Sequence, residues 1–195
     1  MISMVSAYLA SVLLHERVIG PDDREIYQYG FEITIANMVN GIIVILIGAG
    51  FRKIPETVIF YLAFVSLRFF CGGYHADSYS RCFLSFALTS ALCLAASGWI
   101  ARDESILSGL FFLASALLWL CIFKMAPLEH ENRPFTYEER IRFRKRSIQV
   151  LGVWILVGIV LWAAHLTQIL ASLISTFIAV AILMIGGKSH EKGNA

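Results

Sequence analysis

Six apolar segments alternate with short polar connections along this chain. The segments are at about 33–50, 54–71, 82–100, 105–126, 148–165 and 168–187. A helix that crosses the hydrocarbon core of a bilayer needs about 20 residues, within a range of about 17–25. Each segment therefore predicts one membrane-spanning helix. The last two are separated by little more than residues 165–168, which predicts a tight hairpin, because a single continuous helix would be too long for any bilayer.

The first 30 residues follow a different pattern. Apolar residues recur there at the i, i+3, i+4 spacing of one helical face, namely at Val5, Tyr8, Leu9, Val12 and Leu13. Charged residues follow, divided by Gly20 and Pro21. We expect an interfacial amphipathic helix and a polar turn before the first span. A helix packed on the protein's own membrane domain is the alternative. The segment lacks the basic start and the cleavage site of a signal peptide.

These patterns predict an all-α polytopic membrane protein with about six transmembrane helices and an N-terminal amphipathic helix. The expected organisation is an interfacial segment at 1–30, a single membrane domain at 31–187 and a short tail at 188–195. Two polar stretches interrupt the membrane domain, at 68–82 and 127–147.

Composition agrees with a membrane location. Hydrophobic residues make up 58% of the chain and charged residues only 15%, whereas soluble domains carry about 25% charged residues. The net charge of +2 gives no general attraction to nucleic acid. The four cysteines have no zinc-type spacing, so we expect neither a metal site nor a cofactor. Cys93 and Cys121 fall inside apolar segments and are expected to be structural.

The second polar stretch, 127–147, carries a basic cluster. Its members are Arg133, Arg140, Arg142, Arg144, Lys145 and Arg146. Cytoplasmic loops collect Lys and Arg, so this stretch is expected inside the cell. Counting spans from it places residues 72–81 and both termini of the sequence inside as well. The predicted location is the cell membrane. The cluster serves either as a topology signal or as a binding site for an acidic peptide tail, and the sequence leaves both open.

The first polar stretch, 68–82, contains the candidate chemistry. Gly72 and Gly73 break the helical pattern, and they could present backbone N–H groups to an oxyanion. A histidine, an aspartate, hydroxyl groups, an arginine and a cysteine follow. Ionisable groups next to the membrane are energetically expensive, so they indicate a functional site.

Cys82 and His75 are the candidate catalytic pair. The thiolate is the attacking form of cysteine, and Cys82 falls where the third span begins, so the helix dipole favours the charged sulfur. His75 would act as general base and then as general acid. In a straight helix the two would lie about 10 Å apart, so residues 76–81 must bend. Cys71 is a rival nucleophile, but it ends a span, where the dipole disfavours a thiolate.

Two other classes of function compete with an enzyme. A small transporter or exporter would use Arg68, His75 and Asp77 along a substrate path, although the inverted repeats common in transporters are not visible in this sequence. A structural membrane protein would use the glycine pair for close helix packing.

Two motifs resemble the accessory gene regulator protein B (AgrB) family. The first is Arg68-x4-Gly73-Tyr-His75-Ala, with Cys82 seven residues after the histidine. The second is the stretch from Ala126 to Pro134, which reads Ala-Pro-Leu-Glu-His-Glu-Asn-Arg-Pro. The order of apolar segments is also similar, so the resemblance spans nearly the whole chain.

The resemblance implies a membrane cysteine endopeptidase of quorum sensing. Such an enzyme cuts an AgrD-like precursor peptide near its C-terminus, with Cys82 as the nucleophile that forms a thioester and His75 as its acid/base partner. A cysteine or serine of the peptide then closes a thiolactone or lactone ring. Arg68 and Gly73 match positions that the family uses in its site, and a homodimer follows from the likeness alone. The basic cluster here lies later than the family's usual lysines, so the likeness does not extend to peptide-tail binding.

Overall fold

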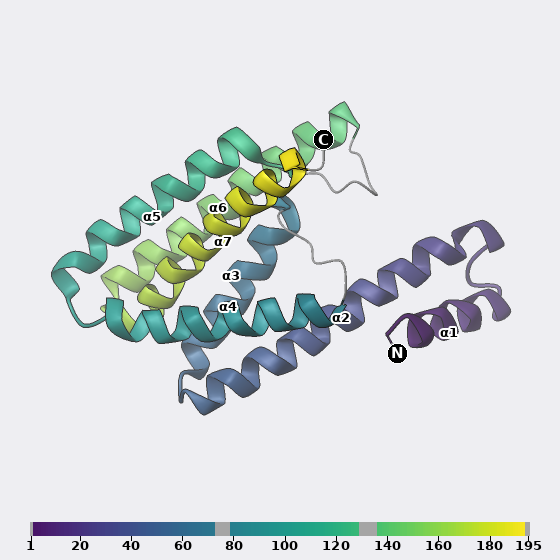
Figure 1. Cartoon of the computed structure of the whole chain (residues 1–195), viewed down its shortest axis with the longest axis horizontal. Coiled ribbons are helices and arrows are strands. Elements are labelled where there is room, and N and C mark those ends of the chain that lie inside the picture. The colour runs from purple at the N-terminus through teal and green to yellow at the C-terminus, as the bar shows by residue number, and fades with distance from the viewer. Residues whose placement is uncertain (1, 73–78, 129–135, 194–195) are drawn as a thin grey trace. The chain divides into compact units, whose positions relative to one another are not determined.

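The computed structural model describes residues 2–72, 79–128 and 136–193, and these are mostly helical (Figure 1). The elements, in chain order, are α1 (Ile2–His15), a 3-10 turn η1 (Pro21–Asp23), α2 (Arg24–Gly50), α3 (Ile54–Cys71), α4 (Tyr79–Ile100), α5 (Glu104–Met125), α6 (Tyr137–Ala163) and α7 (Thr167–Gly193). The described ranges contain no strand. Helices α2 to α7 are each long and apolar enough to cross a bilayer. The predicted all-α, multi-pass membrane fold is therefore confirmed.

Local sequence explains where several helices begin. Pro55 lies in the first turn of α3, where its missing N–H costs nothing. Asp103 caps α5, because its carboxylate accepts a hydrogen bond from the Ser105 N–H at 3.0 Å. The Ser105 hydroxyl donates to the same oxygen at 2.6 Å. These hydrogen bonds from Ser105 hold the pKa of the Asp103 carboxyl below its ordinary value.

Three helices extend six residues or more beyond the predicted apolar segments. Helix α2 begins at Arg24 and not near 33, and α7 continues to Gly193 through part of the expected tail. Helix α6 begins at Tyr137, so residues 137–147 are helical where a polar loop was expected. The prediction followed hydropathy alone, and polar residues with good helix propensity extend a helix without lengthening its apolar stretch.

The chain forms two compact units, Met1–Ile43 and Val44–Ala195. In the first unit, α1 buries Ser6 and Ala10 completely, and the Arg24 guanidinium donates to the Ser11 hydroxyl at 3.4 Å. Tyr8, on the apolar face predicted from the sequence, is 69% exposed. The interfacial role of α1 stays a prediction. The boundary between these units falls inside α2. The division into an interfacial segment at 1–30 and a membrane domain at 31–187 stays a prediction.

The second unit is a helical bundle with α7 at its centre. Helix α7 contacts α3, α4, α5 and α6, and Figure 1 shows α5, α6 and α7 side by side. Its fully buried residues include Leu170, Ala171, Leu173, Ile174 and Phe177. The other helices expose apolar side chains outward, such as Leu84 on α4 and Leu156 on α6, as expected of surfaces that face lipid.

Polar contacts join the helices inside this bundle. The Ser172 hydroxyl of α7 donates to the Glu56 carbonyl of α3 at 2.9 Å. Cys93 of α4 and Ser175 of α7 each donate to the other's carbonyl oxygen, at 3.6 and 3.2 Å. Lys53, in the turn before α3, donates to the Leu94 carbonyl of α4 at 2.9 Å. Such hydrogen bonds fix helix positions where the hydrophobic effect gives little guidance.

Candidate active site at the ends of α3 and α4

The candidate catalytic stretch lies between the end of α3 and the beginning of α4. Helix α3 ends at Cys71, Gly72 follows, and α4 begins at Tyr79. Gly73 and His75 lie outside the described residues. The predicted pairing of Cys82 with His75 is therefore untested and stays a prediction.

Cys82 is in the first turn of α4, and its side chain is half-buried. The other cysteines of α3 and α4 are less accessible: Cys71 is fully buried and Cys93 is 6% exposed. The Cys71 thiol is also hydrogen-bonded to Ser147 of α6. Cys71, the rival nucleophile of the sequence, cannot reach a peptide bond in this conformation, whereas Cys82 is accessible near a helix N-terminus.

Arg68 supplies a positive charge to the region of Cys82. Its guanidinium lies over the Phe64 ring, 5.7 Å from the ring centroid, within the last turn of α3. It is close enough to Cys82 for an electrostatic interaction with the sulfur. The structure thus brings together two of the site residues predicted from the sequence, although they lie on different helices.

Gly72 marks a close approach between the two family-like motifs. Its φ of +72° is in a region that side chains disfavour. A Cβ atom there would also collide with the Leu128 carbonyl oxygen. The Leu128 N–H donates to the Cys71 carbonyl at 3.0 Å, while Ala126 and Pro127 are buried. The segment 126–128 therefore lies directly against the end of α3. The sequence matched this segment to the family but did not predict that it packs against Gly72.

The basic cluster is divided by the structure. Arg133 lies outside the described residues. Arg144 donates to the Phe123 carbonyl of α5, and its guanidinium lies 4.8 Å from the centroid of the Phe123 ring. It therefore holds α5 and α6 together. Arg142, Lys145 and Arg146 are exposed on α6, and Arg140, also exposed, makes contacts of its own.

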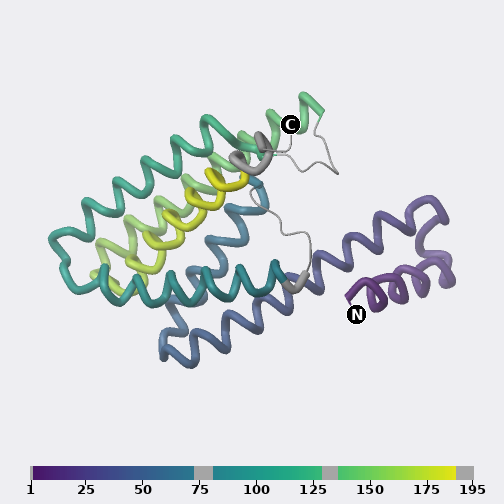
Figure 2. The backbone as a smooth tube through the Cα atoms, viewed as in Figure 1, coloured from purple at the N-terminus to yellow at the C-terminus, as the bar shows by residue number. Residues whose placement is uncertain are grey.

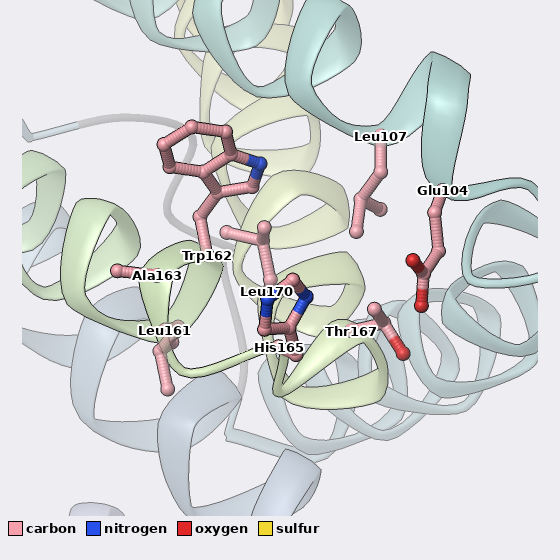
Figure 3. A pocket seen from close by; sticks show the side chains of 8 residues that line it. All are labelled: Glu104, Leu107, Leu161, Trp162, Ala163, His165, Thr167 and Leu170. Atoms are coloured by element: carbon pink, nitrogen blue, oxygen red, sulfur yellow. The ribbon is translucent and has the colours of Figure 1, made fainter.

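The candidate thiol site lies at one end of the bundle, and a cavity lies at the opposite end. Figure 2 shows the end of α3, the end of α5 and the start of α6 on one side, and the α4–α5 and α6–α7 connections on the other. A cavity of about 160 Å³ lies at that second end (Figure 3). Glu104, His165 and Thr167 line it together with the apolar side chains of Leu107 and Leu170 (Figure 3). The cavity has no cysteine in its lining, and it is separate from the candidate thiol site.

No metal centre accompanies the thiol within the described ranges. Those residues contain no group of three or more His, Cys, Asp or Glu side chains that could hold a metal ion.

The fold and the site define a class of protein: a polytopic helical membrane protein with an accessible thiol at the start of a spanning helix, within electrostatic range of an arginine. A family model described as Accessory gene regulator B matches residues 6–185. The chain belongs to this family. Membership implies a role in processing agr quorum-sensing peptides, with an AgrD-like precursor peptide as partner.

Curated relatives agree with this assignment. An AgrB-like protein of Clostridium perfringens strain 13 is 26% identical over 167 residues, which cover 82% of this chain and 76% of the relative. An AgrB-like protein of Listeria innocua is 30% identical over 168 residues, covering 80% of each. No solved structure gives a significant match.

Proposed function

We propose that this protein is a membrane cysteine endopeptidase that cuts an AgrD-like precursor peptide and enables its cyclisation. The observation that carries the proposal is the half-buried Cys82 at the start of α4, within electrostatic range of Arg68. The burial of Cys71 and Cys93 supports Cys82 over these two cysteines.

In the first half-reaction, the Cys82 thiolate attacks the carbonyl carbon of the scissile peptide bond. A carbon–sulfur bond forms and the carbon–nitrogen bond breaks. His75 takes the thiol proton and returns it to the departing amine. The cation of Arg68 would stabilise negative charge on the sulfur or on the tetrahedral oxyanion, as preorganised charges do in such sites.

In the second half-reaction, a cysteine or serine side chain of the bound peptide gives its proton to His75 and attacks the thioester. The new thioester or ester bond closes the ring, and Cys82 leaves as a thiolate. Hydrolysis would compete with this step, since water also attacks thioesters. A nucleophile at the edge of the bilayer limits access of water, and a membrane-bound precursor reaches the site at high effective concentration.

We also propose that this chemistry takes place at the cytoplasmic face of the cell membrane. The basic residues near the start of α6 support that orientation, because Lys and Arg are enriched on the cytoplasmic side.

Trapping of the acyl-enzyme tests the proposal. The full chain would be co-expressed with an AgrD-like precursor, purified in detergent and analysed by intact mass. We expect a covalent adduct with the mass of the N-terminal peptide fragment. Peptide mapping should place the adduct on Cys82, since the other candidate thiol of the stretch, Cys71, is buried.

Matched cysteine variants provide the controls. Cys82→Ala should abolish both the adduct and the cyclic product, while Cys71→Ser, Cys93→Ser and Cys121→Ser should each retain the adduct in the folded protein. Normal peptide processing by the Cys82→Ala variant would show that the nucleophile has been assigned wrongly. His75→Gln should slow adduct formation without changing the amount of folded protein.

A further inference from the structure

The basic residues of α6 point to two different sides of that helix. Arg142, Lys145 and Arg146 have the i, i+3, i+4 spacing that places side chains on one face. Arg144 lies on the opposite face, where it contacts Phe123 of α5. These four basic residues of α6 thus divide into two parts. Arg144 makes an interhelical contact, and the other three cations form a separate face.

The face with three cations continues as an exposed apolar stripe. Val153, Leu156 and Val160 follow on the same side of α6 and are 58%, 64% and 66% exposed. The opposite side is packed into the bundle, since Ser147 and Leu151 are both fully buried. Because the stripe consists of large apolar side chains on a membrane-spanning helix, it faces lipid, and the three cations above it face lipid too.

Helix length places these cations at the depth of the lipid headgroups. Helix α6 has 27 residues, or about 40 Å at 1.5 Å per residue, while the hydrocarbon core is about 30 Å thick. About 20 residues counted back from Ala163 reach Arg144. Lys145 and Arg146 therefore lie at the edge of the core, and Arg142 lies two residues, about 3 Å, beyond it.

The three side chains also have no partner within the part of the chain that the structure describes. Arg142, Lys145 and Arg146 are exposed, and the described residues offer them neither a hydrogen bond nor an ion pair. Long cationic side chains at this depth extend toward the interface, where the counter-charges available are lipid phosphates.

We propose that Arg142, Lys145 and Arg146 form a binding site for the phosphate group of an anionic phospholipid, whose acyl chains lie along Val153, Leu156 and Val160. An acidic peptide tail would match the cations but would gain nothing from the apolar stripe, whereas a phospholipid matches both. The site is independent of the proposed peptidase chemistry, so each can fail without the other.

Native mass spectrometry of the purified full chain tests this site. The protein would be equilibrated with equal amounts of phosphatidylglycerol and phosphatidylcholine, and the ratio of the two retained lipids measured. We expect the wild type to prefer phosphatidylglycerol. In Arg142→Gln/Arg146→Gln, this preference should fall by about 25-fold, since each of the two cations near an anionic surface contributes about a fivefold change in affinity.

Two control variants make the result specific. Arg52→Gln/Arg102→Gln removes the same charge from exposed residues in the turns before α3 and α5, and it should leave the lipid preference unchanged. Arg142→Lys/Arg146→Lys keeps the charge and should keep most of the preference. Circular dichroism and thermal unfolding would confirm that each variant is folded before its lipid ratio is compared.

Four results would overturn the proposal. The first is an unchanged lipid ratio in the Gln double variant. The second is an equal loss of lipid preference in the Arg52→Gln/Arg102→Gln control. The third is a Gln double variant that no longer binds a synthetic oligoglutamate peptide but keeps the lipid ratio of the wild type. That result would assign the face to an acidic peptide. A wild type that shows no lipid preference because the face is covered in a dimer would also contradict it.

Discussion

At the scale of single residues, Gly72 has the least freedom to change. Its backbone has a φ of +72°, and a side chain would meet the Leu128 carbonyl oxygen. Any larger residue must move the segment 126–128 or the end of α3. Since α3 leads directly into the candidate catalytic stretch, such a movement would displace residues near Cys82.

Gly72→Ala should therefore reduce peptide processing strongly. Backbone strain of this kind costs about 1–3 kcal/mol, and the steric overlap adds to it. Processing would be measured as cyclic product formed per folded enzyme. Gly109→Ala is the control, because a Cβ on Gly109 meets no atom within 4 Å. Equal activity of the two variants would mean that the contact between Gly72 and Leu128 is not needed for the site.

Arg68 should affect the rate of thioester formation more than the binding of the precursor. Removing a charge worth about 1–2 kcal/mol at the reacting atoms slows a reaction by roughly five- to thirtyfold. We expect Arg68→Gln to show this loss in the rate of adduct formation, and Arg68→Lys to recover part of it. If both variants form the adduct at the wild-type rate, the charge of Arg68 is not needed for thioester formation.

At the scale of helices, the start of α6 is set by a capping box. The Thr136 hydroxyl accepts a hydrogen bond from the Glu139 N–H at 3.3 Å, and the Glu139 carboxylate accepts one from the Thr136 N–H at 3.0 Å. Thr136→Ala should destabilise this end by about 1 kcal/mol. Hydrogen exchange of the first turn of α6 should become about fivefold faster. Thr34→Ala, which removes a mid-helix hydroxyl of α2, should not change that rate.

The contact between α5 and α6 depends on Gly158. A Cβ atom there would overlap the ring of Phe111, which is itself 2% exposed and cannot move aside. Overpacking costs about 1–3 kcal/mol, so Gly158→Ala should lower the midpoint of thermal unfolding in detergent. Gly152→Ala on the same helix has open space around its Cβ and should be neutral or stabilising. A similar midpoint for both variants would contradict the described packing.

Hydropathy predicted the helices well and their polar ends poorly. The limits of α3 match the predicted segment at 54–71, because Lys53 and Pro55 at one end and Gly72 at the other interrupt the helix where the apolar run also stops. No residue that interrupts a helix lies directly before residue 148. Helix α6 therefore begins earlier, at Tyr137, with Thr136 as its N-cap. Helices stop where the backbone is capped or broken, whereas an apolar run stops where the lipid does, and these positions need not coincide.

At the scale of the whole molecule, the proposed orientation can be tested by labelling. Ser78→Cys, in the α3–α4 connection, should react with a membrane-impermeant maleimide only after the membrane is opened. Ser105→Cys, in the first turn of α5, should react in intact cells. Both would be made in a chain whose natural cysteines are replaced by serine. The reverse pattern would place the candidate site outside the cell.

Only part of the candidate site could be predicted from the sequence. Cys82 could be identified because a cysteine next to polar residues stands out between apolar spans. Its proximity to Arg68 could not be derived from spacing, because it depends on how α3 and α4 pack. The packing of Leu128 against Gly72 likewise joins segments more than 50 residues apart, and the hydropathy of either segment carries no information about the other.

The central position of α7 has a consequence for biogenesis. Helices α3, α4 and α5 precede α7 in the chain, yet each packs on it through residues that are fully buried only in the assembled bundle. After their insertion, these helices must remain in the bilayer as loosely associated neighbours until α7 arrives between them. During this interval Cys93 of α4 lacks its partner Ser175, and the Glu56 carbonyl of α3 lacks the Ser172 hydroxyl. The nascent protein is thus a substrate for membrane quality control until its seventh helix has inserted.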